Sequence, residues 1–289
     1  MAYPLTSETG NLATGGSVSS GDLYYLFGTA LRMGPELATL NLEANEIDIT
    51  GNAGSTITMM EMATGLLSGT IDFGGIWPRA AGAATGITSS VAYGSGGYVQ
   101  YLDSWNIDIT WPEVEITSQG GTARQYRKYM PGGIGTWGGS YTCKADNATP
   151  PVAPGIAAST TGTFKMGEGG TDDPTLSGSI LTPRLVQRIK IGDVSVLTYT
   201  FKGTGELTQK AGTSLPGLLY TGTTATAITK PTWDIDSNGV ADNTVVLTAA
   251  TGRTFTGPAF WTKLSLAWKM DDVVRVTGTL RFAGDVTIA

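Results

Sequence analysis

The chain has 289 residues and a mass of 30.0 kDa, which allows one large all-β domain or two domains of ordinary size. It contains no histidine and one cysteine, Cys143, which excludes the Ser-His and Cys-His dyads, histidine ligation of zinc and an intrachain disulfide. The formal net charge of −6 argues against a protein built to hold nucleic acid, because phosphate contacts need lysine and arginine.

Glycine and threonine dominate the composition, with 41 and 44 residues, while charged residues make up only 15% of the chain, against about a quarter in an average domain. Hydrophobic residues still account for 40%, which is enough apolar surface for a folded core. Glycine-rich turns between β-branched segments are typical of sheets. The composition therefore predicts an all-β protein.

Residues 1–36 begin with a Gly/Ser/Thr-rich stretch and are expected to form an N-terminal arm and a connecting segment. Residues 37–100 alternate apolar and polar side chains, which predicts the opening strands of a first β-repeat. The segment STITMMEMATGLL, residues 55–67, is expected to hold the one short helix of the chain.

Internal repetition is the most informative feature of the sequence. The segment EIDIT at residues 46–50 recurs as EVEIT at residues 113–117, sixty-seven residues later. In both copies a turn then leads to a second strand, at residues 67–73 and 137–143. The pattern predicts two copies of one β-rich unit, although short strand segments also resemble one another because few residue types favour strands.

A second pair of similar segments is expected to form the closing strand of each copy. TYTFKGTGELT at residues 198–208 aligns without gaps on TGTLRFAGDVT at residues 277–287. Residues 101–210 are therefore expected to form the second repeat with its closing strand, and residues 145–175, rich in Pro, Ala and Thr at their start, a long loop within it. Residues 211–289 are expected to complete the first repeat, although the sequence leaves the pairing of opening and closing strands open.

No basic start followed by an apolar stretch occurs at the N-terminus, and no run of eighteen apolar residues occurs anywhere. We therefore expect neither a signal peptide nor a membrane span.

Several motifs of residues 101–146 follow one another in a recognisable order. They are the alternating strand WNIDI (105–109), the strand VEITS (114–118), a connection with Gly121, Arg124, Tyr126 and Pro131-Gly132, and the small-residue strand WGGSY (137–141) ahead of Asp146. The closing strand FKGTGEL (201–207) completes the pattern. In this order the chain resembles the major tail tube proteins of long-tailed (siphovirus-type) bacteriophages, over about a third of its length. The first copy departs from the pattern because it lacks the arginine and the Pro-Gly pair.

This resemblance implies an all-β fold with one short helix, built as duplicated tail-tube-type β-sandwich or barrel domains. It also implies homo-oligomeric rings whose sheets join edge to edge. The duplicated form implies trimeric rings with six-fold pseudosymmetry, stacked into a tube in the virion tail and assembled in the host cytoplasm. Other tail proteins are implied as partners, genomic DNA would pass through without specific binding, and no catalytic activity or cofactor is expected.

An acidic channel wall would repel DNA over roughly 8–10 Å at physiological salt. The carboxylates of two alternating strands are the candidates for this wall: Glu46, Asp48, Glu113 and Glu115. An ordinary solvated outer face is the alternative for these strands. A small basic and aromatic group is expected in a loop that contacts a neighbouring subunit: Arg124, Tyr126, Arg127 and Lys128.

One loop has the spacing of a calcium ligand set. Residues 234–242 read D-x-D-x-N-G-x-x-D, which makes four side chains candidate Ca²⁺ ligands: Asp234, Asp236, Asn238 and Asp242. The bidentate glutamate expected at position twelve is absent, since Val245 occupies it, and an ordinary turn favours the same residue types.

The leading hypothesis is a tail tube subunit. Another virion structural protein, such as a head-decoration or tail-terminator protein, is the nearest alternative, and a calcium-binding cell-surface adhesion module is a second. An enzyme is disfavoured because the chain has no histidine and no nucleophile motif.

Overall fold

The computed structural model describes residues 11–14, 24–26, 29–31, 34–48, 62–76, 89–93, 99, 101–117, 127–145, 160–166, 175–210, 225–228, 244–250, 253–270 and 274–289. These residues form strands and connections, and none of them is helical. The all-β prediction is confirmed. No described segment provides a helix that is long and apolar enough to cross a membrane.

The strands of the first half are β1 (Asn11–Thr14), β2 (Tyr24–Leu26), β3 (Thr29–Leu31), β4 (Gly34–Asp48), β5 (Met62–Ile76), β6 (Ser89–Tyr93), β7 (Leu102–Thr110), β8 (Glu113–Glu115), β9 (Tyr129–Pro131) and β10 (Thr136–Lys144). Those of the second half are β11 (Thr160–Met166), β12 (Thr175–Arg188), β13 (Val196–Lys210), β14 (Thr226–Ala227), β15 (Thr244–Ala250), β16 (Arg253–Lys269), β17 (Arg275–Phe282) and β18 (Thr287–Ile288).

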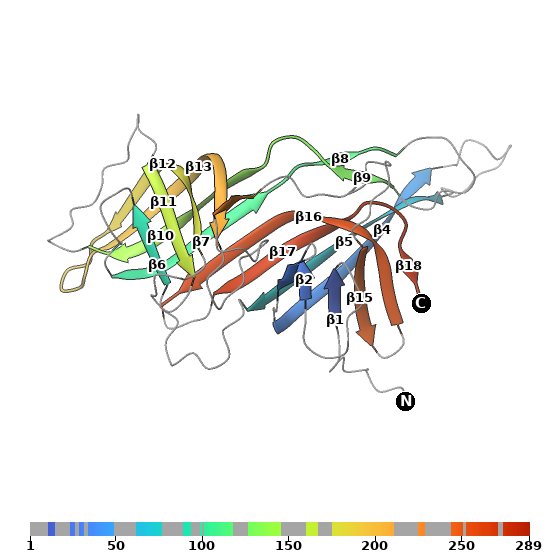
Figure 1. Ribbon diagram of the computed structural model, residues 1–289, viewed down its shortest axis with the longest axis horizontal. Helices are drawn as coiled ribbons and strands as arrows, with labels where there is room; N and C mark the ends of the chain where they lie inside the picture. The colour runs from blue at the N-terminus through green and yellow to red at the C-terminus, as the bar shows by residue number, and fades with distance from the viewer. Residues whose placement is uncertain are drawn as a thin grey trace, which may run out of the picture.

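One large antiparallel sheet runs through the molecule in the order β4-β5-β17-β16-β7-β10-β13-β12-β11-β6, with β15, β1, β14 and β18 attached beside this path (Figure 1). The sheet folds over on itself. Trp105 of β7 packs against Phe164 of β11 with ring centroids 5.8 Å apart, although β10, β13 and β12 lie between these strands in the sheet. Side chains from both layers thus share one core, as in a β-sandwich.

The helix predicted at residues 55–67 is wrong for the part that the structure describes, because residues 62–67 belong to strand β5. Further along β5, Ile71 and Phe73 are buried while Asp72 is exposed, which is the period of a strand with one wet face. The apolar run before Ile71 hid this alternation. Residues 55–61 lie outside the described residues.

The long loop predicted over residues 145–175 contains a strand. β11 pairs with β12 on one side and with β6 on the other. Threonine and phenylalanine within TTGTFKM favour an extended backbone, and Phe164 supplies a fully buried side chain. The Pro/Ala-rich start of the segment masked this short strand signal in the composition.

The strands form two equivalent sets. The first unit consists of β1, β4, β5, β15, β16, β17 and β18, and the second unit of β6 to β13. In each unit the strands follow the same order in the sheet, with β4-β5-β17-β16 corresponding to β7-β10-β13-β12. The second unit is inserted between β5 and β15 of the first.

The closing hairpins of the two units share one register. Lys263 lies opposite Thr279 in the first unit, and Arg184 lies opposite Thr200 in the second, so both partners are displaced by the same 79 residues that separate Thr198 from Thr277. The equivalence continues at the strand ends, where Phe255 pairs with Ile288 just as Leu176 pairs with Gln209.

The opening strands correspond as well. Leu40 lies opposite Ile71, which in turn lies opposite Leu280. The same chain of partners in the second unit is Ile107, Gly139 and Phe201. Ile71 is therefore structurally equivalent to Gly139. The sequence alignment of residues 67–73 with 137–143 instead matches Ile71 with Tyr141, two residues further along the chain. A slip of two residues keeps every side chain on the same face, so the alternating pattern alone does not reveal it.

The two units join through β16 and β7. Residues 263–269 of β16 pair antiparallel with residues 104–110 of β7. The Ser265 hydroxyl donates a 2.6 Å hydrogen bond to Asp108 Oδ1, and Leu264 and Leu266 are fully buried beside Ile107 and Ile109. This junction makes one continuous core from the two units.

Candidate assembly surfaces

A hairpin arm of the second unit lies on the first unit. The arm consists of β8 and β9, which pair with each other and extend beyond the β7–β10 ladder. Tyr129 N–H donates a 3.1 Å hydrogen bond to the carbonyl oxygen of Ala283, and its buried side chain packs with Ala283 and Phe260. Arg127 N–H donates to the carbonyl oxygen of Leu67 at 2.7 Å.

Arg281 holds the arm electrostatically. Its guanidinium carbon lies 3.8 Å from the ring centroid of Tyr129, which is close enough for a cation–π interaction. Its Nε lies 3.3 Å from Glu113 Oε2 as an ion pair, without the alignment of a hydrogen bond. A second pair joins Arg127 Nη1 to Glu115 Oε2 at 3.3 Å. Sequence reasoning missed the contact between Arg281 and Tyr129, because nothing in the chain indicates that two residues 152 positions apart meet here.

The four predicted channel carboxylates occupy equivalent positions of the two units, because β7 and β8 together span the residues that correspond to β4. Glu46 and Asp48 close β4, and Glu113 and Glu115 form the ends of β8. Glu46 is exposed. The arginines 281 and 127 compensate the charges of Glu113 and Glu115, both of which are 41% exposed. The expectation that these carboxylates line a channel stays a prediction.

The predicted basic loop is only partly described. Arg127 binds Glu115 of its own chain, and Lys128 donates its backbone N–H to Thr117 Oγ1 at 2.9 Å. Arg124 and Tyr126 lie outside the described residues. So do all four candidate calcium ligands: Asp234, Asp236, Asn238 and Asp242. Within the residues that are described, no group of three or more acidic or cysteine side chains could hold a metal ion.

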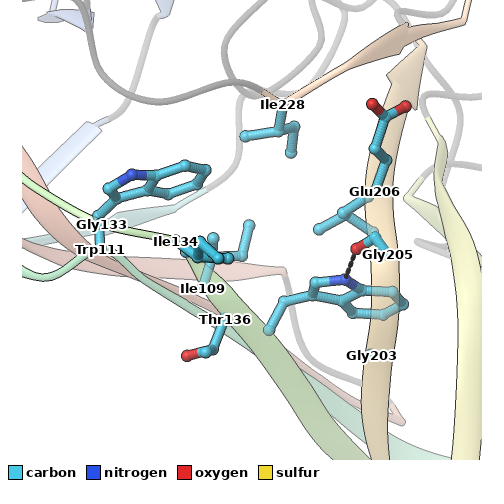
Figure 2. A pocket seen from close by; sticks show the side chains of 12 residues that line it. Ile109, Trp111, Gly133, Ile134, Thr136, Gly203, Gly205, Glu206 and Ile228 are labelled. Atoms are coloured by element: carbon cyan, nitrogen blue, oxygen red, sulfur yellow. Dashed lines mark hydrogen bonds between the residues drawn. The ribbon is translucent and has the colours of Figure 1, made fainter.

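An open cavity of about 550 Å³ lies between the end of β7 and the bend of β13 (Figure 2). Its wall includes Trp111, Ile134, Trp137 and Ile228, and Glu206 is the single titratable side chain among the lining residues. The indole of Trp137 donates to the carbonyl oxygen of Gly205 at 3.1 Å. With one carboxylate and otherwise mostly apolar walls, this cavity offers no pair of groups for acid–base or nucleophilic chemistry.

The single cysteine is a core residue. Cys143 is 6% exposed on β10, and burial, with a smaller contribution from the negative charge of Asp103, raises the pKa of its thiol to about 11. A thiol with a raised pKa is a poor nucleophile near neutral pH. Cys143 therefore packs as a small hydrophobic side chain.

Comparison with known proteins finds no family model that matches this chain and no curated protein that is similar to it.

Proposed function

We propose that this protein is the tail tube subunit of a long-tailed bacteriophage, a virion structural protein that assembles into stacked rings. The observation that carries the proposal is the ordered set of motifs from residues 105 to 146, closed by FKGTGEL at residues 201–207. Each motif alone is common among β-proteins, and their order is what resembles the tail tube family.

The architecture supports the proposal. The chain already contains two equivalent units joined edge to edge through β16 and β7. A unit that can join a copy of itself in this way is suited to rings, and two units per chain fit a ring of three chains with six-fold pseudosymmetry. Edge strands are a hazard in monomers, and a ring uses them for closure.

The charge balance supports a passive channel. With 24 acidic and 18 basic side chains, the chain lacks the excess of cations that would bind phosphates through counterion release. DNA would pass such a wall without a specific contact. Other tail proteins would cap the two ends of the tube.

Negative-stain electron microscopy of the purified protein over a range of concentrations tests the proposal. Hollow tubes or stacked rings, with a pore wider than duplex DNA, are the expected result. Rings that never stack would favour a terminator or head-decoration protein instead. A protein that remains monomeric at every concentration, and that loses thermal stability in chelator, would overturn the proposal in favour of the calcium-binding module.

A further inference from the structure

Two strand edges, one in each unit, correspond to the two edges that meet at the junction between β16 and β7. Residues 184–188 of β12 correspond to the part of β16 that pairs with β7, and β4 corresponds to β7. Within the described part of the chain, this stretch of β12 pairs only with β13, and β4 pairs only with β5. We infer that β12 of one chain pairs antiparallel with β4 of a second copy, in the register of the β16–β7 junction.

Two apolar side chains on β12 and the turn after it are exposed, although their equivalents in the first unit are buried. Leu181 is 39% exposed, whereas its equivalent Phe260 is fully buried under Tyr129 of the arm. Ile189 is 76% exposed, whereas its equivalent Trp268 is 6% exposed opposite Trp105. In the first unit, the second unit supplies the cover. In the second unit no described residue covers the same positions, and in the inferred contact the first unit of a second copy covers them.

The register that follows from the internal junction brings opposite charges together. Lys263 lies opposite Thr110, and transferring this pair to the free edges places Arg184 opposite Glu43. Leu185 then lies opposite Leu42, as Leu264 lies opposite Ile109 within the chain. Cross-strand pairs of opposite charge and of apolar residues both stabilise an antiparallel ladder.

The ion pair of the arm transfers in the same way. Arg281 corresponds to Lys202, and Glu113 corresponds to Glu46. Lys202 and Glu46 therefore form an equivalent pair with one positive and one negative side chain. Within the chain Lys202 and Glu46 are both exposed, and neither forms an ion pair with a described residue. They lie on different units, and a copy docked through β4 brings Glu46 of one chain to Lys202 of the next. Glu46 thus belongs to the subunit contact in this arrangement.

The two free edges lie in opposite halves of the molecule, β12 in the left half of Figure 1 and β4 in the right half. Joining unlike edges makes a head-to-tail contact, which generates a ring when its rotation closes. The inference rests on the self-assembly in the proposed function, but it does not require the rings to stack or to carry DNA.

A disulfide cross-link tests the register. Thr39 and Arg188 are both exposed and fall opposite each other in the inferred ladder, where Cα atoms lie roughly 4.5–5.5 Å apart, a distance that a disulfide spans. The T39C/R188C variant is expected to form covalent dimers and trimers under oxidation, seen on a non-reducing gel. The T39C/Q187C variant, one residue out of register with its thiols on opposite faces, is the control and should remain uncrosslinked. Equal cross-linking of both, or of neither in an assembled sample, overturns the inference.

Charge exchange tests the ion pair. K202E is expected to raise the concentration needed for assembly by about tenfold, E46K to do the same, and the double variant K202E/E46K to restore assembly. K210E, which makes the same charge change at the C-terminal end of β13, is the control and should assemble normally. Two single variants that assemble like the parent protein would contradict the contact.

The two failures are distinguishable. Tubes that form without the T39C/R188C cross-link would refute the register and leave the tail tube function standing. Cross-linked rings that never stack would establish the contact and refute the tube.

Discussion

The ring of Trp137 lies directly against the backbone of Gly203 on the neighbouring strand. A Cβ atom at Gly203 would stand only 1.9 Å from Cε2 of this indole, and one at Gly178 would stand 2.6 Å from its Cζ2. The indole N–H also donates to the carbonyl oxygen of Gly205, which has a φ of +76°. Three glycines thus create the space and the acceptor for one tryptophan, which explains part of the high glycine content.

Replacing Gly203 with alanine should therefore destabilise the protein by about 1–3 kcal/mol, because the indole has to leave its site to make room. Denaturant unfolding monitored by tryptophan fluorescence measures the change. Gly74→Ala is the matched control, since a Cβ there meets only Thr277 Cγ2 at an ordinary 3.6 Å. Equal stabilities of the two variants would show that Trp137 tolerates a side chain at residue 203.

The buried Cys143 thiol should resist alkylation in the folded protein. A pKa raised from 9.0 to about 11 lowers the thiolate fraction at pH 8 about a hundredfold, and burial slows the reaction further. The rate of alkylation, measured with and without urea, checks this. Rapid labelling of the folded protein would contradict the buried position of the thiol.

The same pKa difference makes stability depend on pH in a defined window. Below pH 9 the thiol is protonated in both states, so its contribution to stability is fully present. Between pH 9 and about 11 the unfolded state loses the proton first, and the free energy of unfolding contributed by Cys143 falls. Comparison with C143A over this range isolates the effect from the titration of lysine and tyrosine. Parallel pH profiles of the two proteins would exclude it.

Much of the fold can be predicted from the sequence, because alternation and repetition are local signals. Residues 46–48 of EIDIT end β4 and residues 113–115 of EVEIT form β8, at positions that the strand register makes equivalent, and the alignment of residues 198–208 with 277–287 gives the observed register of the closing hairpins. The extension of that repeat to the whole β12–β13 hairpin required the structure, since its other positions share few identical residues. Composition and period predict an all-β protein, whereas the two-layered sandwich is an implication of the family resemblance.

Other features depend on tertiary contacts that leave no local signal. The slip between Ile71 and Gly139 preserves side-chain faces and is therefore invisible to a period-two pattern. The docking of Tyr129 under Arg281 joins distant parts of the chain, and no local pattern of the sequence predicts that contact. The exposure of Leu181 becomes informative only when it is compared with the burial of its equivalent, Phe260.

Arg281 should control how firmly the arm is held. R281A removes both the ion pair with Glu113 and the contact with the Tyr129 ring, and it should weaken arm docking by about 1–2 kcal/mol. Hydrogen exchange of the amides of β8 and β9 is expected to rise by roughly five- to thirtyfold, with little change in β10. R281K keeps the charge and loses the planar stacking, so it should show an intermediate rate. Unchanged exchange in R281A would mean that backbone hydrogen bonds alone hold the arm.

The assembled protein should not retain duplex DNA even at low salt, where electrostatic attraction is least screened. At about 50 mM salt a surface with many free cations binds DNA strongly, and the affinity falls steeply as salt rises. Here the acidic side chains outnumber the basic ones, 24 to 18, and Arg127 and Arg281 are each paired with a glutamate. A gel-shift titration of protein into labelled duplex, with a basic DNA-binding protein as the positive control, measures the affinity. Saturable binding that weakens steeply with salt would show a cationic surface facing the DNA and would contradict a passive channel.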